Sequence, residues 1–168
     1  MPSAALPLRF WPDAGLARPG APVGRITDAV RRLAADMLET MYAAPGRGLA
    51  APQVGEGVRL FVMDATWRDG TPAPRVCVDP QITWRGGLTG VGAEACLSIP
   101  GVTARVRRPV TVALRYTGLE GARHETRLTG AEARIAQHEA DHLDGIVTLD
   151  RVSRAERRAL EAACAARA

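Results

Sequence analysis

The chain has 168 residues, of which 46% are hydrophobic and 24% charged, a composition typical of a globular protein with a substantial buried core. All 22 of its basic residues are arginine, and the net charge is +4. Because lysine is absent, Schiff-base chemistry and a P-loop lysine are excluded. No apolar run approaches the roughly 20 residues of a membrane span. The first 21 residues lack the pattern of a signal peptide. We therefore expect a cytoplasmic protein with no membrane contact.

The first half of the chain predicts one helix and several strands. Residues 1–24 are rich in proline and glycine and are expected to run extended over the surface. Apolar residues at helical spacing predict an amphipathic helix over 27–43, and Pro45 and the glycines after it end this helix. The strands expected after it cover 58–63, 76–78, 82–84, 102–106, 110–116 and 124–128.

Two helices are predicted at the end of the chain, and each begins with a capping-box pattern. The first starts at residues 129–132 and continues to about Leu143, and the second starts at 153–156. Strands followed by helices favour an α+β fold. We predict a single domain over residues 1–168, with mixed or antiparallel sheets wrapped around one central helix, and with a C-terminal helix.

The central helix contains the sequence His138-Glu139-Ala140-Asp141-His142, which is an H-E-x-x-H pattern. Residues four apart lie on the same face of a helix, so both imidazoles can reach one metal ion. Glu139 is close enough to take a proton from metal-bound water without being a ligand. The alternative is a charge-rich solvated helix, but the chain has only three histidines and two of them fall in this pattern. We predict that His138 and His142 are metal ligands and that Glu139 is the acid/base.

A catalytic site of this kind needs a third protein ligand. The extended metalloprotease pattern would place a histidine at position 148, which is threonine. Another peptidase arrangement uses a glutamate about 20 residues downstream, where Glu161 is the candidate. Glu161 lies among arginines, where an exposed carboxylate is the simpler explanation.

The remaining candidate for the third ligand is Cys96, which we expect on a loop after the glycine-rich residues 86–92. A free cysteine is also commonly a small buried apolar residue, so the residues alone leave the third ligand open. The other two cysteines, Cys77 and Cys164, form no C-x-x-C pair and indicate neither a disulfide framework nor a zinc ribbon.

Three segments of the chain resemble the peptide deformylase family. Gly46–Gln53 is similar to the family's G-x-G-L-A-A-x-Q motif, and Glu94–Ser98 is similar to its E-G-C-L-S motif. Gln137–Gly145 is similar to its Q-H-E-x-D-H-L-x-G motif. The three occur in the family's order and approximate spacing, and the similarity extends from about residue 6 to residue 158.

The resemblance implies a metal-dependent hydrolase that removes the formyl group from N-formylmethionine of nascent polypeptides and releases formate. One divalent ion would be bound by Cys96, His138 and His142. This ion is commonly Fe²⁺ in the cell, and Zn²⁺, Ni²⁺ or Co²⁺ can take its place. Glu139 would transfer the proton. The side-chain amide of Gln53 and the backbone N–H of Leu97 would donate to the formyl oxygen as its charge develops.

The resemblance also implies that the substrate peptide pairs as an added strand with backbone near Gly48 and before Cys96. Its binding residues would be Gly48, Arg47, Ala95 and Ile135.

Three positions depart from the family pattern. Ala95 replaces a glycine, which would cost about 1 kcal/mol if the backbone φ there is positive. Arg47 lies where the family is usually apolar, and Ala131-Glu132 replaces a common leucine pair. These departures leave open an alternative, a deformylase-like hydrolase acting on another formamide or small amide.

Two further interpretations concern charged residues around the motifs. Arg108 lies where the family often has an arginine paired with the position of Glu94, although a surface arginine is also a reasonable reading. Asp141 is expected to orient a ligand histidine or to bond locally, and a solvated aspartate fits equally well.

The last helix has a basic edge, which is either a solvated face or a contact with the ribosome. The arginines of this edge are Arg151, Arg154, Arg157 and Arg158. No basic stripe interleaved with aromatic residues is present, so no contact with DNA is expected. Two other functions remain to be distinguished: a zinc peptidase that uses Glu161, and a non-catalytic module stabilised by a metal.

Overall fold

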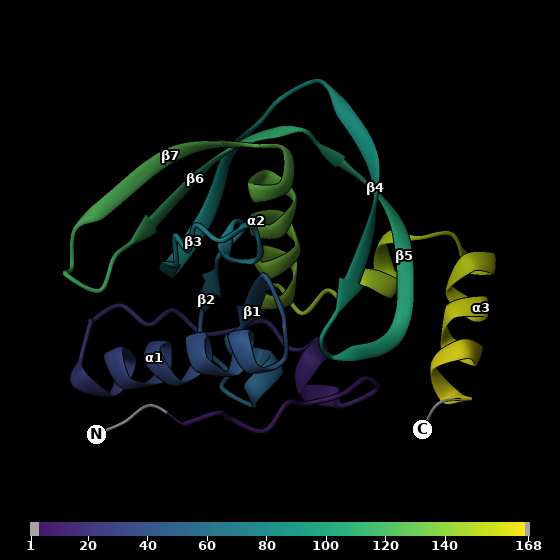
Figure 1. Ribbon diagram of the computed structural model, residues 1–168, viewed down its shortest axis with the longest axis horizontal. Coiled ribbons are helices and arrows are strands. Elements are labelled where there is room, and N and C mark those ends of the chain that lie inside the picture. The colour runs from purple at the N-terminus through teal and green to yellow at the C-terminus, as the bar shows by residue number, and fades with distance from the viewer. Residues whose placement is uncertain (1–3, 167–168) are drawn as a thin grey trace.

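The computed structural model describes residues 4–166 and contains two antiparallel sheets arranged around the helix that carries the H-E-x-x-H pattern (Figure 1). The larger sheet has the strand order β1-β2-β3-β6-β7, and the smaller one is the hairpin β4-β5. The strands are β1 Gly48–Ala50, β2 Leu60–Met63, β3 Arg75–Arg85, β4 Thr89–Cys96, β5 Ile99–Pro109, β6 Thr111–Thr117 and β7 Arg123–Thr129. Every pairing between these strands is antiparallel.

Within residues 4–166, three α-helices accompany the sheets. They are α1 Asp28–Ala43, α2 Gly130–Leu143 and α3 Arg154–Ala165. The same part of the chain has four short 3-10 helices between the larger elements: η1 Ala14–Ala17, η2 Ala51–Val54, η3 Trp67–Asp69 and η4 Thr148–Arg151. The predicted α+β fold with a central helix and a C-terminal helix is confirmed. The extent of a single domain over 1–168 stays a prediction.

Helix α2 is central because its apolar face is buried against the larger sheet. Ala133, Ala136 and Leu143 of α2 pack in one cluster with Phe61, Leu128 and other residues of β2, β3, β6 and β7. Burying a side chain of the size of leucine or phenylalanine stabilises the fold by roughly 1.5–3 kcal/mol. The opposite side of α2 faces β5, so the helix is held between the two sheets.

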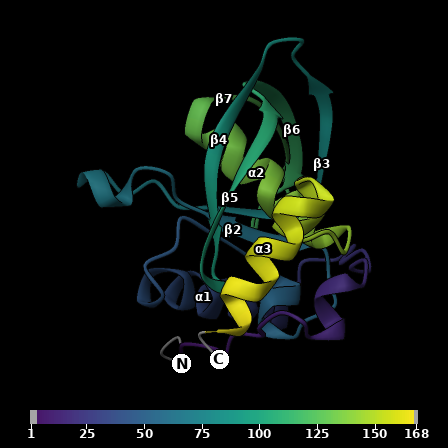
Figure 2. The same ribbon diagram turned by 90° about the vertical axis from the view of Figure 1, so that its right-hand side faces the viewer.

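The other two helices cover separate parts of the molecule. Helix α1 buries Ala34, Met37 and Met41 in a second cluster with β1 and β2. Helix α3 packs on the outside of β5 and η4 and is attached through a third cluster that contains Leu160 and Leu149. Figure 2 shows α3 lying along the outer face of the β4–β5 hairpin. Among residues 4–166, no helix is long and apolar enough to cross a membrane.

The prediction of separate strands at 76–78 and 82–84 was wrong, because both belong to β3. The strand is irregular between Val78 and Gln81, where Asp79 has a φ of +48°. The carboxylate of Asp79 accepts hydrogen bonds from the backbone N–H groups of Val23 and Gly24, at 2.7 and 2.8 Å. These bonds hold the unusual backbone conformation and attach the N-terminal segment to the sheet.

The N-terminal segment is less uniformly extended than expected. Residues 14–17 form η1, and Leu16 in it is buried. Residues 1–3 of the predicted segment lie outside the described residues.

The two capping predictions have different outcomes. Ser153 accepts the backbone N–H of Glu156 at 3.2 Å, as expected, although the carboxylate of Glu156 accepts from Arg105 instead of closing the box. Thr129 precedes α2 but makes no capping hydrogen bond. Gly130 has a φ of +57°, and the Thr129 hydroxyl lies 3.5 Å from that of Thr111 on β6.

Candidate metal site

The three predicted metal ligands meet at the point where the β4–β5 hairpin touches α2. Cys96 is the last residue of β4, and the prediction of a loop there was wrong, because residues 89–96 pair with β5. One ligand atom from each of Cys96, His138 and His142 lies within 4.8 Å of the other two. The Sγ of Cys96 is 3.3 Å from Nε2 of His142. All three side chains are at least nine-tenths buried.

Glu94 fixes the orientation of His138. Its Oε2 lies 3.0 Å from Nδ1 of His138, which leaves Nε2 of that ring free to face Cys96. Burial alone would raise the pKa of Glu94, but hydrogen bonds from His138 and Arg108 outweigh burial and hold this pKa well below its usual range. Glu94 therefore stays ionised and acts as a fixed acceptor for the ring.

Two arginines hold Glu94 in turn. Arg108 on β5 donates from Nε at 2.6 Å and from Nη2 at 3.0 Å, so the predicted pair of Arg108 with Glu94 is confirmed. Arg134 on α2 donates from Nη1 at 2.8 Å. These hydrogen bonds link β4, β5 and α2 across the interior, and they position Cys96 relative to the helix.

Asp141 has a different role from the one expected of it. It is 9% exposed and bonds neither ligand histidine, so both the solvated aspartate and the histidine-orienting aspartate were wrong. It accepts from Nη1 of Arg108 at 2.9 Å and from Arg151 of η4. Asp141 therefore extends the buried network of charges to the connection that leads into α3.

Glu139 is 3% exposed and lies beside the cluster. Burial raises its pKa to about 7, against a partial opposing effect from His138. Its Oε2 has no hydrogen-bond partner among the described residues. A Cβ added to Gly48 would overlap the Glu139 carboxylate, so β1 can approach this side chain only because position 48 is glycine. Glu139 thus has an unsatisfied oxygen facing a space that a ligand could fill.

The pKa values of the His138 and His142 imidazoles are shifted in opposite directions. Burial disfavours the charged form of both rings, but hydrogen bonds with Cys96 and Glu94 raise the pKa of His138 well above its ordinary value. His142 has no such carboxylate partner, and burial together with the charge of His138 lowers its pKa well below the ordinary value. The Nδ1 atom of His142 is buried without a partner among the described residues.

Gln53 and Leu97 lie on the other side of Cys96. Gln53 is fully buried, and its Oε1 accepts the backbone N–H of Ala50 at 2.9 Å. Its Nε2 donates to the Ser98 hydroxyl at 3.1 Å and lies 3.6 Å from the Cys96 sulfur. Leu97 lies in the tight turn between β4 and β5. The structure therefore brings both residues next to the metal-binding cluster.

Cys96 and His138 line a cavity of about 720 Å³, and the four predicted substrate-binding residues also line it. They are Gly48, Arg47, Ala95 and Ile135. Asp79 is the only non-glycine residue with a positive φ in the range 4–166, so the expected backbone cost at Ala95 does not arise. Strand β1 is an edge of the larger sheet, and β4 pairs only with β5. The cavity therefore lies between two strand edges that have no partner.

The residues of this cluster fit a divalent metal ion. A thiolate and two imidazoles form a donor set that suits iron, zinc, nickel and cobalt. The unpartnered Oε2 of Glu139 lies beside these donors, where a metal ligand such as water would satisfy it. Glu161 is outside the cluster and pairs with Arg157 at 2.7 Å, which removes the basis for the peptidase arrangement. Three protein donors with a buried glutamate beside them are typical of mononuclear metallohydrolases.

Comparison with known proteins identifies the family. The model of the polypeptide deformylase family matches residues 5–158. A peptide deformylase of Mesorhizobium japonicum is 43% identical over 151 residues, covering 90% of this chain and 86% of that protein. A peptide deformylase structure from Synechococcus elongatus in complex with actinonin has a TM-score of 0.90 at 38% identity, covering 99% of this chain and 90% of that one. A Met-Ala-Ser-bound class I type b enzyme from Acinetobacter baumannii has a TM-score of 0.83 at 33% identity, covering 89% and 99%.

The chain therefore belongs to the polypeptide deformylase family. It is a hydrolase of the class that removes formyl groups, and the family uses a divalent metal.

Sequence reasoning missed two residues that shape this site. Its only candidate for orienting a ligand histidine was Asp141, with a local bond or a solvated aspartate as alternatives, whereas Glu94 performs this role. It also overlooked Arg134, which lies four residues before His138 and therefore on the same face of the helix as that ligand. The spacing of four residues could therefore have predicted that Arg134 lies near His138. The glycines of β4 concealed the strand, and Gly92 in particular leaves space for the guanidinium of Arg134.

We expect Arg108→Ala to destabilise the protein by about 3–5 kcal/mol, because it leaves the buried carboxylates of Glu94 and Asp141 with fewer partners. Urea unfolding followed by tryptophan fluorescence measures this change. The control is Arg115→Ala, which breaks an exposed pair with Glu125 and should cost less than about 1 kcal/mol. Equal, small effects from both variants would contradict a structural role for the buried network.

Proposed function

We propose that this chain removes the formyl group from N-formylmethionine at the start of nascent polypeptides and releases formate. Membership of the family and the cluster of Cys96, His138 and His142 support this activity. Cys96, His138 and Glu139 also line one cavity. Nascent polypeptides emerge in the cytoplasm, which we propose as the location of the protein.

In this proposal, Cys96, His138 and His142 hold one divalent ion, and Fe²⁺ is the ion in the cell. Zn²⁺, Ni²⁺ or Co²⁺ would suit the same donors in purified protein. When bound, the ion would acidify a water molecule and polarise the formyl oxygen. Glu94 keeps the His138 ring in the orientation that this binding needs.

Glu139 is the acid/base of the proposed reaction. Its carboxylate accepts the proton of the attacking water and then delivers it to the amine that leaves with the peptide. Efficient transfer in both directions requires a pKa near the working pH, and burial raises the pKa of Glu139 to about 7. Because position 48 is glycine, the backbone of β1 can lie directly against this carboxylate, which a side chain there would overlap.

Gln53 and Leu97 stabilise the charge that develops on the formyl oxygen. The Gln53 carbonyl is fixed by the backbone of Ala50, so its amide N–H groups face Ser98 and Cys96 without rearrangement. Donors fixed before the reaction need no reorganisation when the charge develops. The backbone N–H of Leu97 is the second proposed donor.

The peptide binds as an extended segment between the free edges of β1 and β4. Backbone pairing gives affinity without requiring a particular sequence. Ile135 contributes apolar surface for the methionine side chain, and Ala95 and Arg47 flank the path of the peptide. The related enzyme from Acinetobacter baumannii binds Met-Ala-Ser, a peptide that begins with methionine.

We expect Glu139→Gln to lower kcat/KM for formyl-Met-Ala-Ser by about 10²–10⁴-fold, because the acid/base is lost while the metal donors remain. Formate release and metal content are measured on the same preparation. Glu125→Gln, a change to an exposed glutamate on β7, is the matched control and should retain full activity. Unchanged turnover in the Glu139 variant would favour a non-catalytic metal-stabilised module instead.

Metal analysis of protein purified without oxygen should find one iron per chain. Cys96→Ala should lose most of this metal, because one of three protein donors is removed. Cys77→Ala and Glu161→Gln should retain it, since Cys77 is buried in the larger sheet and Glu161 lies on α3. Loss of metal from the Glu161 variant together with retention in the Cys96 variant would instead identify Glu161 as the third ligand.

We also propose that α3 contacts the ribosome through its basic edge. Arg157 pairs with Asp150 and Glu161, and Arg151 pairs with Asp141, which leaves the exposed Arg154 and Arg158 as the free cations of this edge among the described residues.

Co-sedimentation with ribosomes should decrease steeply as salt rises. It should also weaken in a variant with Arg154→Glu and Arg158→Glu. Arg123→Glu at the distant β6–β7 turn is the control (Figure 1). Binding that does not depend on salt would exclude contact between the ribosome and α3. An Arg123 variant that weakens binding as much as the double variant would exclude it too.

A further inference from the structure

Two arginines form one rim of the catalytic cavity. Arg47 lies between the two glycines of the segment that leads into β1, and Arg68 belongs to η3. Both side chains line the cavity that also contains Cys96 and Glu139. We refer to Arg47 and Arg68 together as the arginine rim.

The positive charge of the arginine rim is poorly compensated. The nearest acidic group to Arg47 is Asp69, at 3.9 Å and with an exposed side chain. The Nε atom of Arg47 is buried without a hydrogen-bond partner among the described residues. Within residues 4–166 no acidic side chain pairs with Arg68, whose guanidinium lies 5.5 Å from the ring centre of Trp67. An exposed pair at the distance of Arg47 and Asp69 contributes little, so both guanidinium groups are available to a ligand.

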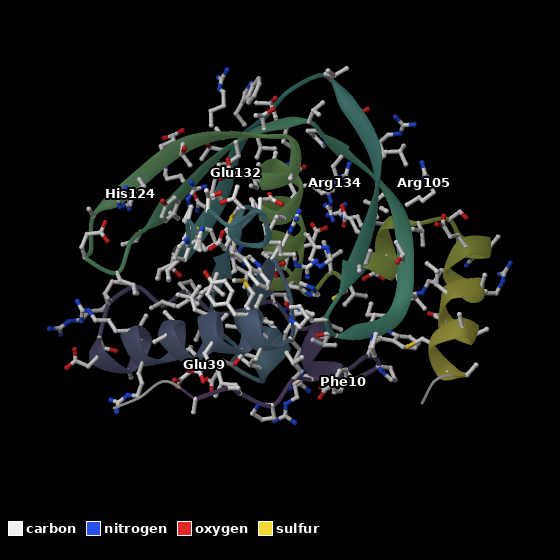
Figure 3. All side chains as sticks on the ribbon, viewed as in Figure 1. Phe10, Glu39, Arg105, His124, Glu132 and Arg134 are labelled. Carbon is white, nitrogen blue, oxygen red and sulfur yellow. The ribbon has the colours of Figure 1, made fainter. Side chains whose placement is uncertain are left out.

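The third arginine of the cavity, Arg134, differs in this respect. Figure 3 shows it between α2 and the β4–β5 hairpin. It donates to Glu94, to the carbonyl of Val106 at 2.9 Å and to the carbonyl of Gly90 at 3.0 Å. Its charge is therefore satisfied within the protein, and the uncompensated charge belongs to the arginine rim.

The loop that carries Arg68 is fixed against the segment that carries Arg47. The indole Nε1 of Trp67 donates to the carbonyl of Gly46 at 2.8 Å. The ring of Tyr42 packs edge-on against Trp67. The buried carboxylate of Asp64 accepts the backbone N–H of Trp67 at 3.0 Å and the hydroxyl of Tyr42 at 2.7 Å. The two arginines are thus held at one place beside Gly48, which abuts Glu139.

The cavity has apolar as well as cationic lining residues. Ala131 and Ile135 on α2 supply apolar surface for the methionine side chain. An extended peptide advances by about 3.3 Å per residue, so the residues after methionine pass the rim within one or two steps. A carboxylate there can accept hydrogen bonds from a guanidinium that has few other partners.

We propose that the arginine rim makes this enzyme prefer formylated peptides with an acidic side chain at the second or third residue. The inference rests on the proposed deformylation of formylmethionyl peptides and adds a substrate preference to it. Arg47 and Arg68 are specificity-determining residues in this view and take no part in the chemical step.

The first test compares amidated formyl-Met-Glu-Ser with its neutral isostere formyl-Met-Gln-Ser and with formyl-Met-Lys-Ser. Formyl-Met-Ala-Glu and formyl-Met-Ala-Gln form the second pair. The glutamate peptide of at least one pair should have a kcat/KM about two- to fivefold higher than its glutamine isostere, with the difference in KM. The lysine peptide should be the poorest substrate. Salt at about 1 M should remove most of the difference, because the rim is partly exposed.

A double variant, Arg47→Glu with Arg68→Glu, should reverse the order so that the lysine peptide is preferred over the glutamate peptide. Arg85→Glu, at the end of β3 and outside the cavity, should keep the wild-type ratio. Calorimetric binding of the amidated products Met-Glu-Ser and Met-Gln-Ser gives a readout that needs no turnover, and the glutamate product should bind more tightly by the same factor.

The outcomes separate the two proposals. If none of the peptides is deformylated, the proposed function fails. If the glutamine peptide is deformylated as efficiently as the glutamate peptide in both pairs, the proposed function stands and the arginine rim has no role in selection. A preference that persists in the double variant also excludes the rim as its cause. The substrate ratios of the wild-type enzyme decide the matter even if the double variant does not fold.

Discussion

The carboxylate of Glu94 is bonded by three side chains from two elements, β5 and α2, and the geometry of the metal site depends on it. It accepts from Arg108 on β5, from Arg134 on α2 and from the ring of His138, which is itself a proposed ligand. Cys96 lies two residues further along the same strand, so the position of the sulfur relative to the helix is set by these bonds. Removing water from so many charges costs free energy that only a nearly complete set of partners offsets. Moving the hairpin relative to α2 would leave some of these charges without partners, so the network favours the arrangement that brings the thiol to the imidazoles.

This constraint explains why the proposed ligands come from a helix and a hairpin. A helix alone can present His138 and His142 to one ion, because four residues make about one turn, but the third donor must come from another element. The β4–β5 hairpin supplies that donor, and its attachment to α2 is largely polar. The larger sheet attaches to the opposite face of α2 through apolar packing. One face of α2 thus stabilises the fold, and the other carries the proposed ligands. The bond between Arg108 on β5 and Asp141 near the end of α2 attaches the hairpin to the helix a second time.

The sequence predicted those parts of the molecule that depend on local spacing. Helical periodicity located α1, a capping-box pattern located α2, and the H-E-x-x-H pattern placed two proposed ligands and Glu139 on one helix. It failed where long-range packing decides. Strand β4 has the glycine-rich composition of a loop, yet it forms a strand because its backbone pairs with β5 and because Gly92 leaves room for Arg134. The role of Asp141 was misjudged for the same reason, since its partners Arg108 and Arg151 are distant in sequence.

The departures from the family pattern differ in how close they lie to the buried network, since Ala95 is next to Glu94 on β4 whereas Arg47 is outside the network. Ala95 adopts an ordinary extended backbone, so its methyl group adds no strain. Arg47 is attached through a turn whose neighbours are fixed by Trp67 and Asp64, and none of these residues bonds a proposed ligand. A change at the rim alters the potential that a passing peptide experiences without displacing the sulfur, the imidazoles or Glu139. Because the two sets of contacts are separate, the residues that recognise the peptide are free to change while the residues that would perform the reaction stay in place.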